Sequence, residues 1–312
     1  MRSCEAVQGG DFGASAQEPT PVAIASGDVT LRADAFGDPR DVPVVLLHGG
    51  GQTRHSWRAT GADLAAEGWY VLAVDHRGHG DSDWSPEGRY DSQAMASDVA
   101  NIVDHLGARP VLVGASLGGT ASLAALGHNP ELALGLVLVD VSPFLQSKGR
   151  ERIVSFMTAN PEGFASLDEM ADAVAAYLPH RRRPNDLNGL RNNMRERNGR
   201  IFWHWDPAFL NTATDDAVGR DIDSGLLAAA AAVLRFPTLL VRGAESDVLS
   251  REDARRFLDL VPHADFCEIA DARHMVAGDE NTGFGSVLGD FLERRIRPRC
   301  QLLAELQLDR GD

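Results

Sequence analysis

The chain has 312 residues, of which 44% are hydrophobic and 24% charged, a composition typical of a globular protein with one large domain and an insertion. Thirty basic against forty-five acidic residues give a formal net charge of −15, which argues against a nucleic-acid-binding surface or a polybasic membrane patch. The three cysteines, Cys4, Cys267 and Cys300, are too few and too far apart for a disulfide framework, and none has the spacing of a zinc site.

The amino-terminal segment, residues 1–19, contains no apolar run that would serve as the core of a signal peptide. Nowhere does the chain contain eighteen consecutive apolar residues, the length needed to cross a bilayer as a helix. We therefore expect residues 1–19 to form a flexible tail, and the protein to be cytoplasmic with no membrane partner.

From Pro21 onward, short β-branched apolar runs alternate with longer amphipathic stretches, the pattern of parallel strands joined by helices. A hairpin is expected first, because two short strands are separated by a tight turn. The expected strands are 22–25, 29–35, 42–47, 70–74, 110–113, 134–139, 237–241 and 265–269, and the expected helices are 56–67, 92–106, 117–126 and 284–295. The pattern predicts an α/β fold with a mostly parallel eight-stranded sheet and helices on both faces.

Between residues 142 and 235 the pattern changes, because no convincing buried strand occurs and the segment is charged and helical. Ser166 and Glu169 form a capping-box pattern that predicts the start of a helix, and an alanine-rich run at 228–232 fits the last helix of the segment. An insertion at the carboxyl end of a parallel strand lies over the crevice where ligands bind. We therefore predict a helical cap at 142–235 within a core made of 20–141 and 236–297; the remaining 298–312 is a tail that either docks on a partner subunit or frays.

The stretch from Val111 to Gly119 (VLVGASLGG) places Ser116 where an apolar strand ends and a helix begins. This is the pattern of a nucleophile elbow, in which a tight turn needs glycine two residues before and after the serine. The following helix would point backbone N–H groups at an oxyanion formed there. The alternative is a glycine-rich turn with no catalytic role. Residues elsewhere in the chain have to distinguish the two interpretations.

A serine hydroxyl is a weak nucleophile at neutral pH and needs a base. Of the ten histidines, only His274 follows the last predicted strand, at the sheet edge where the elbow lies. His48 also lies near this edge, but it directly follows a buried strand and is expected to brace its loop. The other histidines are expected to be solvated or structural, which leaves His274 as the candidate base.

A carboxylate usually holds such a histidine in the correct tautomer. Asp247 and Glu245 lie in the loop after the strand that follows the cap, and the order Ser116, Asp247, His274 is the chain order of this class of triad. Asp140, at the end of the strand after the elbow helix, is the rival. The chain order favours Asp247.

Two backbone N–H groups are needed to bind the oxyanion. One is expected from Leu117, and the other from Gly50 or Gly51 in the run His48-Gly49-Gly50-Gly51-Gln52. A phosphate-binding role for this loop is disfavoured, because it lacks both the Lys-Ser/Thr ending of a P-loop and the GxGxxG spacing of a dinucleotide turn.

Five short motifs, HGGGQ, DHRGHGDS, GASLGG, RGAESD and RHM, follow one another in an order and spacing that resembles the α/β-hydrolase superfamily over about residues 20–297. The resemblance implies an α/β-hydrolase fold with a helical cap before the strand that carries the triad acid. It implies Ser116 as nucleophile, His274 as general base and Asp247 as its partner, with Leu117 and Gly50 as oxyanion donors. The DxRGxGxS turn at 75–82 resembles a structural element of the family.

The nucleophile type narrows the chemistry. Epoxide hydrolases and haloalkane dehalogenases of this fold use an aspartate where this chain has Ser116, so both are disfavoured. Our leading hypothesis is a serine hydrolase that cleaves a small or medium carboxylic ester or lactone through an acyl-enzyme, with no metal or organic cofactor. The alternatives are a cofactor-free perhydrolase or haloperoxidase, a carbon–carbon bond hydrolase with the same triad, and a hydrolase-like ligand receptor.

Substrate specificity is the least determined property. The candidate substrate-binding side chains are Trp203, Trp205, Phe202 and Met157 of the cap and Met275 beside the candidate base. The arginine run 181–183 is a candidate anion-binding patch, although such runs usually face solvent. The expected partner is a small-molecule substrate, and the sequence does not distinguish a monomer from a homodimer.

Overall fold

The computed structural model describes residues 18–181, 183, 185–214, 224–276 and 282–308, so most of the predicted amino-terminal tail lies outside the described residues. A single eight-stranded sheet forms its centre, with the order β1-β2-β4-β3-β5-β6-β9-β10. The pairs β1–β2 and β2–β4 are antiparallel and the other pairs are parallel. The strands are β1 (Thr20–Ser26), β2 (Val29–Phe36), β3 (Pro43–Leu47), β4 (Tyr70–Val74), β5 (Val111–Ala115), β6 (Gly135–Val139), β9 (Thr238–Gly243) and β10 (Asp265–Ile269). The predicted α/β class with a mostly parallel eight-stranded sheet is confirmed.

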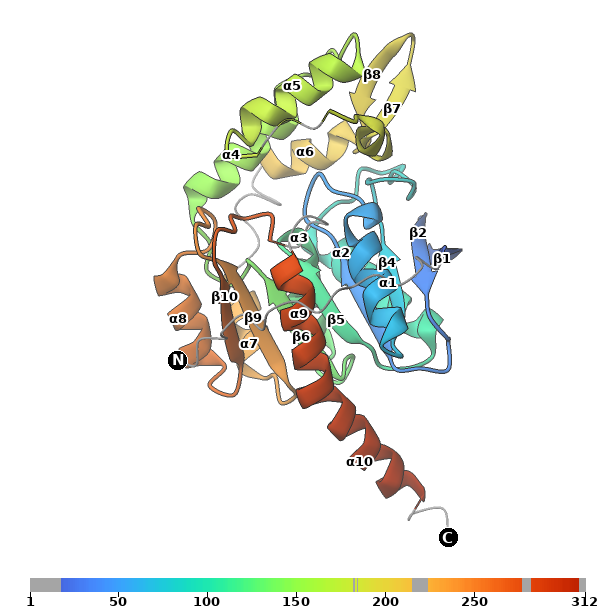
Figure 1. Ribbon diagram of the computed structural model, residues 1–312, viewed down its shortest axis with the longest axis vertical. Helices are drawn as coiled ribbons and strands as arrows, with labels where there is room; N and C mark the ends of the chain where they lie inside the picture. Colours follow the sequence, from blue (N-terminus) through green and yellow to red (C-terminus); the bar gives the residue numbers. More distant parts are fainter. Residues whose placement is uncertain (1–17, 182, 184, 215–223, 277–281, 309–312) are drawn as a thin grey trace.

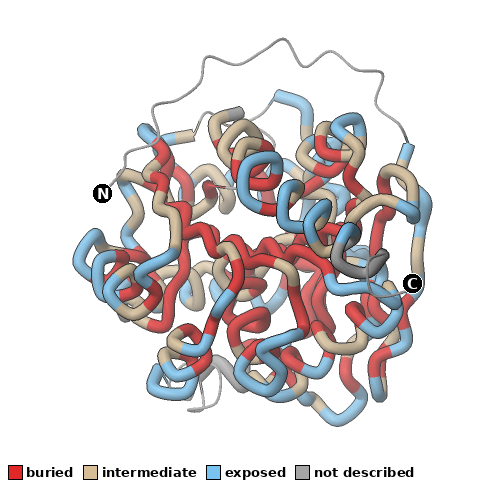
Figure 2. Tube along the Cα trace, turned by 90° about the horizontal axis from the view of Figure 1, so that it is seen from below, coloured by how far each residue is buried: buried red, intermediate tan, exposed pale blue. Residues whose placement is uncertain are grey.

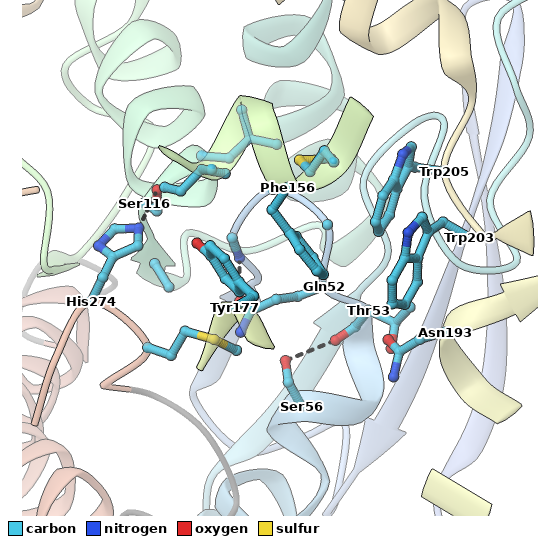
Figure 3. A pocket seen from close by; sticks show the side chains of 18 of the residues that line it. Gln52, Thr53, Ser56, Ser116, Phe156, Tyr177, Asn193, Trp203, Trp205 and His274 are labelled. Atoms are coloured by element: carbon cyan, nitrogen blue, oxygen red, sulfur yellow. Dashed lines mark hydrogen bonds between the residues drawn. The ribbon is translucent and has the colours of Figure 1, made fainter. Parts of the chain in front are cut away.

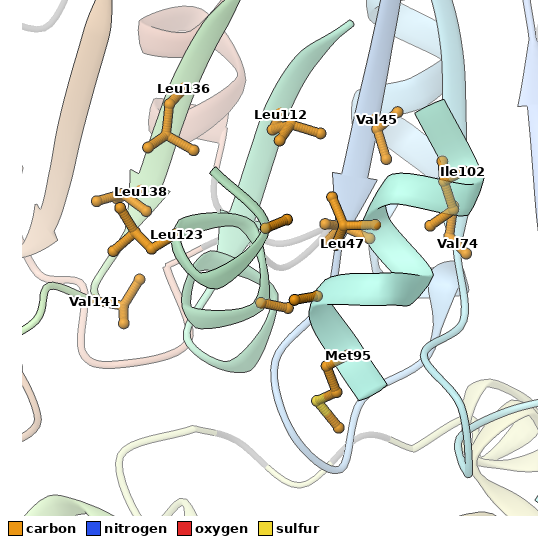
Figure 4. Packing of buried hydrophobic residues seen from close by; sticks show 14 of the residues in the cluster. Val45, Leu47, Val74, Met95, Ile102, Leu112, Leu123, Leu136, Leu138 and Val141 are labelled. Carbon is orange, nitrogen blue, oxygen red and sulfur yellow. The ribbon is translucent and has the colours of Figure 1, made fainter. Parts of the chain in front are cut away.

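The sheet is buried on both faces because its central strands are apolar at every position. In β3, Val45 and Leu47 join one core cluster and Val44 and Leu46 join the other, as the two-residue period of a strand requires. Figure 4 shows the first cluster, in which strand residues meet side chains of two helices, including Ile102. Buried segments accordingly run through the middle of the molecule and exposed ones lie around it (Figure 2).

Helices cover both faces of the sheet, as predicted. One face packs against α1 (Arg58–Ala66), α9 (Thr282–Phe291) and the π-turn Leu292–Ile296. The other packs against α2 (Ser92–Leu106), α3 (Leu117–His128), α7 (Ser224–Ala232) and α8 (Arg251–Leu260). A short 3-10 turn, Arg54–Trp57, precedes α1. Asp91 caps α2 by accepting a hydrogen bond from the Ala94 N–H at 2.8 Å, which explains where that helix begins.

The insertion lies above the carboxyl ends of the strands (Figure 1). It comprises α4 (Ser147–Thr158), α5 (Leu167–Tyr177), the 3-10 turn η2 (Asn188–Asn193), β7 (Met194–Arg197), β8 (Arg200–Trp203) and α6 (Pro207–Thr214). The predicted capping box begins α5, where the Ser166 hydroxyl accepts from the Glu169 N–H at 3.2 Å. The hairpin β7–β8 was not predicted, because its short strands are mostly exposed and lack a clear apolar alternation.

The cap ends earlier than the sequence indicates. The alanine-rich α7 packs against α3 in the core rather than on the cap. A Cβ on Gly127 of α3 would lie 3.1 Å from the Ala230 Cβ, so the two helices approach closely. The predicted boundary at residue 235 is therefore wrong, and α7 belongs to the layer that covers the sheet; helical periodicity does not tell which surface a helix packs on.

The carboxyl-terminal segment, predicted as a tail at 298–312, is a helix over most of its length. The π-turn leads directly into α10 (Arg297–Leu308), which projects from the body of the molecule (Figure 1). Arg297 anchors its start, because the Arg297 Nη2 donates to the Glu67 carbonyl at 2.9 Å and the guanidinium lies over the Trp69 ring. No described helix is long and apolar enough to cross a membrane, and the cytoplasmic location stays a prediction.

Candidate active site

Ser116 lies in a strained turn between β5 and α3, with φ 46° and ψ −109°. Two neighbouring glycines make this turn possible. A Cβ on Gly114 would lie 2.3 Å from the Gly119 nitrogen, and a Cβ on Gly118 would lie 2.4 Å from the Leu47 carbonyl oxygen. Any larger residue at either position would clash with backbone, so the spacing seen in the sequence is a steric requirement of the elbow.

His274 lies within hydrogen-bond distance of this serine, as predicted. Its Nε2 is 3.1 Å from the Ser116 Oγ, and the two side chains point toward one another at one end of the pocket (Figure 3). The His274 Nδ1 is 2.8 Å from the Oδ2 of Asp140. With the proton on Nδ1 donated to this carboxylate, Nε2 is free to accept the serine proton. The serine, the histidine and the carboxylate thus form one hydrogen-bonded series, as in a catalytic triad.

Asp140, the rival in the sequence, is thus the carboxylate on His274. It directly follows β6, with a positive φ of 52°, and its side chain is fully buried. Besides His274, it accepts the Gly243 N–H at Oδ1, 3.0 Å away, and the Ser246 hydroxyl at Oδ2. Three donors around one buried carboxylate fix its position and compensate its negative charge.

The choice of Asp247 as the partner of the histidine is wrong. Asp247 is exposed and its Oδ2 pairs with the Arg152 Nη1 at 2.5 Å; the other candidate in that loop, Glu245, pairs with Arg273. Within this loop it is Ser246 that points inward, toward Asp140, while its neighbours point out. Asp140 reaches His274 because β6 lies beside β5 and both strands end at the same sheet edge.

The candidate oxyanion donors lie next to the serine. The Gly49 N–H donates to the Gln52 Oε1 at 2.9 Å, so it is already bound. Leu117 is the first residue of α3, where an N–H has no acceptor within the helix. Gly50 is near it, because a Cβ on Gly50 would lie 4.0 Å from the Leu117 Cδ2, whereas Gly51 approaches the cap side chain Met157. Gly50 and Gly51 both stay candidates for the second donor, and Gly50 is the one whose Cβ position faces Leu117.

Gln52 was not singled out in the sequence, yet its side chain holds the oxyanion loop. Replacing it in Gln52→Leu frees the Gly49 N–H and lets the loop relax, so we expect kcat to fall about tenfold with KM within about twofold. Gln52→Glu keeps an acceptor oxygen and is expected to retain more activity. Steady-state kinetics on a p-nitrophenyl ester measure both effects; a change confined to KM would assign Gln52 to substrate binding instead.

Below this loop lies a cluster of four buried histidines, His48, His76, His79 and His204. Burial lowers the pKa of His76 to about 3 and that of His79 to about 4. Burial, and next the neighbouring histidines, also lower the pKa of His48 and of His204 well below the ordinary value. All four are therefore neutral at pH 7, and the prediction that they are structural fits this arrangement.

Two members of the cluster hold backbone of the site. The His48 Nδ1–H donates to the Gly49 carbonyl at 2.8 Å, as expected for a side chain that braces its loop. His204, from the cap, has its Nε2 3.3 Å from the Gly51 carbonyl oxygen, and its Nδ1 accepts the Gly80 N–H at 2.7 Å. The cap is thereby tied to both the oxyanion loop and the turn after β4.

A cavity of about 420 Å³ opens beside Ser116 and is covered by the cap. Four of the predicted substrate-binding residues line it, namely Trp203, Trp205, Met157 and Met275. The two indoles stack with ring centroids 5.0 Å apart and form one wall (Figure 3). Phe202 does not line the cavity, because alternate residues of β8 face opposite sides, and its ring instead packs under the Arg197 guanidinium.

Further wall residues could not be assigned from the sequence. They come from α4, α5, η2 and α6 of the cap, from the start of α3 and from the loops before α4 and after β9, and are mostly apolar: Leu117, Leu145, Ile153, Val154, Phe156, Val174, Tyr177, Leu178, Leu190, Phe209, Leu210 and Val248. The polar side chains of the lining include Gln52, Thr53, Ser56 and Asn193 (Figure 3). The cavity thus has mostly apolar walls with a few polar groups, as small-molecule sites commonly do.

The described arginines of the run 181–183 make different contacts. The Arg181 Nη2 donates to the Met275 carbonyl at 3.3 Å, beside His274. Arg183 pairs with Asp168 and Asp172 on α5, away from the cavity, and Arg182 lies outside the described residues. Of the two arginines of the run that the structure describes, Arg181 lies near the site and Arg183 does not.

Comparison with known proteins identifies the family. Residues 42–280 match the family model of the alpha/beta hydrolase fold. The chain belongs to the α/β-hydrolase family. Esterase Rv0045c of Mycobacterium tuberculosis is 30% identical to it over 266 residues, which cover 81% of this chain and 83% of that protein. The predictions of an α/β-hydrolase fold and of an α/β-hydrolase enzyme are confirmed.

Two further relatives extend the comparison. The sn-1-specific diacylglycerol lipase ABHD11 of Danio rerio is 28% identical over 277 residues, covering 85% of this chain and 83% of that protein. The crystal structure of E-2-(acetamidomethylene)succinate hydrolase superposes with a TM-score of 0.75, covering 88% of this chain and 99% of that one. Its sequence identity is 22%, so this last likeness concerns the fold.

Proposed function

We propose that this α/β hydrolase cleaves a small or medium carboxylic ester through an acyl-enzyme, with Ser116 as nucleophile, His274 as general base and Asp140 as the acid that orients the base. The observation that carries the proposal is the continuous hydrogen-bonded line from the Ser116 Oγ through His274 to the Asp140 carboxylate. Relatives named esterase and diacylglycerol lipase support ester bonds as the target.

The geometry accounts for each step of acyl transfer. The His274 Nε2 takes the hydroxyl proton as the Ser116 Oγ attacks the ester carbonyl carbon, and the N–H groups of Leu117 and Gly50 bind the oxyanion. When the ester bond breaks, the imidazolium returns the proton to the departing alkoxide. Water then attacks the acyl-enzyme with the same base, and the acid product leaves with the Ser116 hydroxyl restored.

The cavity supports a substrate of limited size. Its volume of about 420 Å³ falls in the range of small-molecule sites, and its walls are mostly apolar. The cap residues Trp203, Trp205 and Met157 would contact the substrate on the side away from the sheet, and Met275 would contact it beside the base. A lactone of similar size would fit the same chemistry.

The test is covalent labelling combined with turnover. Incubation with a fluorophosphonate probe is expected to modify Ser116, identified by mass spectrometry of the tryptic peptide, and Ser116→Ala is expected to remain unlabelled. Wild-type protein is expected to hydrolyse short p-nitrophenyl esters. Absence of labelling in folded protein would refute the proposal, and labelling without ester turnover would favour carbon–carbon bond cleavage or perhydrolysis with the same three residues.

A further inference from the structure

Positive charge gathers at one end of the cavity although the chain as a whole is acidic. Arg150 lines the main cavity, and Arg152, Arg181 and Arg273 line a small recess beside it. His274 belongs to both linings, so the two spaces meet at the candidate base. We call this group the arginine rim.

Three members of the rim have partners and one does not. Arg152 pairs with Asp247, Arg273 pairs with Glu245, and Arg181 donates to a carbonyl. For Arg150, which is half-buried, the structure gives no hydrogen bond or ion pair with any residue in the part of the chain that it describes. The rim therefore carries four cations and only two paired carboxylates, so its net charge is positive.

The position of Arg150 on α4 directs it toward the substrate. Arg150, Ile153, Val154 and Met157 all line the cavity, at the i, i+3, i+4 and i+7 spacing of one helix face. The three other side chains on this face are apolar. Arg150 is half-buried beside these apolar side chains and has no carboxylate partner among the described residues, so its guanidinium is available to an anionic group of a ligand.

His180 lies in the field of the three other members of the rim. Desolvation, and next the positive charges of Arg273, Arg181 and Arg152, lower the pKa of His180 below its ordinary value. The positive charge of the rim, which Asp247 and Glu245 offset in part, attracts an anion to this side of the base.

We propose that Arg150 binds a carboxylate carried by the substrate, so that the preferred substrate is an ester with a second, negatively charged end, such as a monoester of a dicarboxylic acid. The inference rests on the proposed ester hydrolysis. A guanidinium holds a carboxylate through two parallel N–H···O bonds, which fixes orientation as well as charge. The apolar walls accommodate the carbon chain between the two ends.

The test compares two esters of similar length, mono-p-nitrophenyl glutarate and p-nitrophenyl hexanoate. In Arg150→Gln we expect kcat/KM for the glutarate to fall about 10- to 100-fold, and that for the hexanoate to stay within about threefold. Arg150→Lys keeps the charge but loses the paired bonds, so an intermediate loss is expected. Raising the salt concentration should reduce the wild-type preference for the glutarate.

The matched control is Lys148→Gln, which removes one positive charge from the exposed side of the same helix. This variant is expected to leave both rates unchanged. Equal losses on both esters in Arg150→Gln, or no loss on either, would overturn the inference while ester hydrolysis stands. If wild-type protein hydrolyses neither ester, the proposed function itself fails and the inference fails with it.

Discussion

Asp140→Asn is expected to lower kcat about 10⁴-fold, with KM changed much less, because an amide at this position favours the wrong tautomer of His274 and gives no charge stabilisation to the imidazolium. The substitution keeps the shape of the side chain. Steady-state kinetics on a p-nitrophenyl ester measure the effect, and circular dichroism and thermal melting verify that the variant is folded.

Asp247→Asn is the matched control for this prediction. Asp247 is exposed and bound to Arg152 of the cap, so its replacement is expected to change kcat no more than about threefold. A large loss in Asp247→Asn together with near-normal activity in Asp140→Asn would contradict the assignment of the acid. Ser246→Ala is expected to fall between the two, because it removes one donor to the Asp140 carboxylate.

Acidification is expected to unfold this protein over an unusually narrow pH range, because four histidines that are buried in the neutral form take up protons together on unfolding. In the folded state their pKa values lie below the ordinary value of about 6.5. Burial lowers the pKa of His76 to about 3 and that of His79 to about 4. Below pH 6.5 the unfolded chain binds protons that the folded chain cannot. Stability is therefore full above about pH 6.5 and decreases as the pH falls toward 4, by up to about 1.4 kcal/mol per pH unit for each histidine.

The measurement is the free energy of unfolding in urea between pH 4.5 and 7.5. His79→Phe removes one of these groups, and it is the suitable variant because the His79 Nε2 has no hydrogen-bond partner among the described residues and the ring packs edge-to-face on Phe209. We expect a shallower dependence on pH in this variant, and no change of slope in the control His105→Gln, which replaces an exposed histidine. A slope in His79→Phe equal to that of wild type would show that His79 is not buried in the neutral form.

The elbow and the sheet could be predicted because their requirements are local. Gly114 and Gly118 have to be glycine for steric reasons that act within a few residues, so the motif marks Ser116 without knowledge of the rest of the fold. Buried parallel strands are likewise visible as continuous apolar runs. His274 followed from its position after the last strand, because strand ends on one side of a parallel sheet lie at one edge.

The acid could not be chosen from the sequence in the same way. Asp140 and Asp247 both follow strands that end at this edge, and chain order favoured the wrong one. What separates them is the direction of each side chain: a positive φ turns the Asp140 carboxylate inward, whereas Asp247 faces solvent. Backbone torsions in loops depend on contacts between distant segments, here Asp140 with Gly243 and Ser246.

In the cap, too, the sequence predicted some features and the structure was needed for others. The sequence identified an insertion and its tryptophans, but not that α7 packs on the core, that Phe202 faces away from the cavity or that Arg150 faces into it. Periodicity shows that a helix or strand has distinct faces, but not what each face meets.

By itself the sequence determined the fold class and marked Ser116 and His274 as the candidate nucleophile and base, because these depend on strand order and on short steric motifs. Only the tertiary structure showed which carboxylate contacts the candidate base and which side chains line the cavity. Each of these depends on where side chains from β6, β9, the oxyanion loop and the cap point when segments far apart in the chain are packed together.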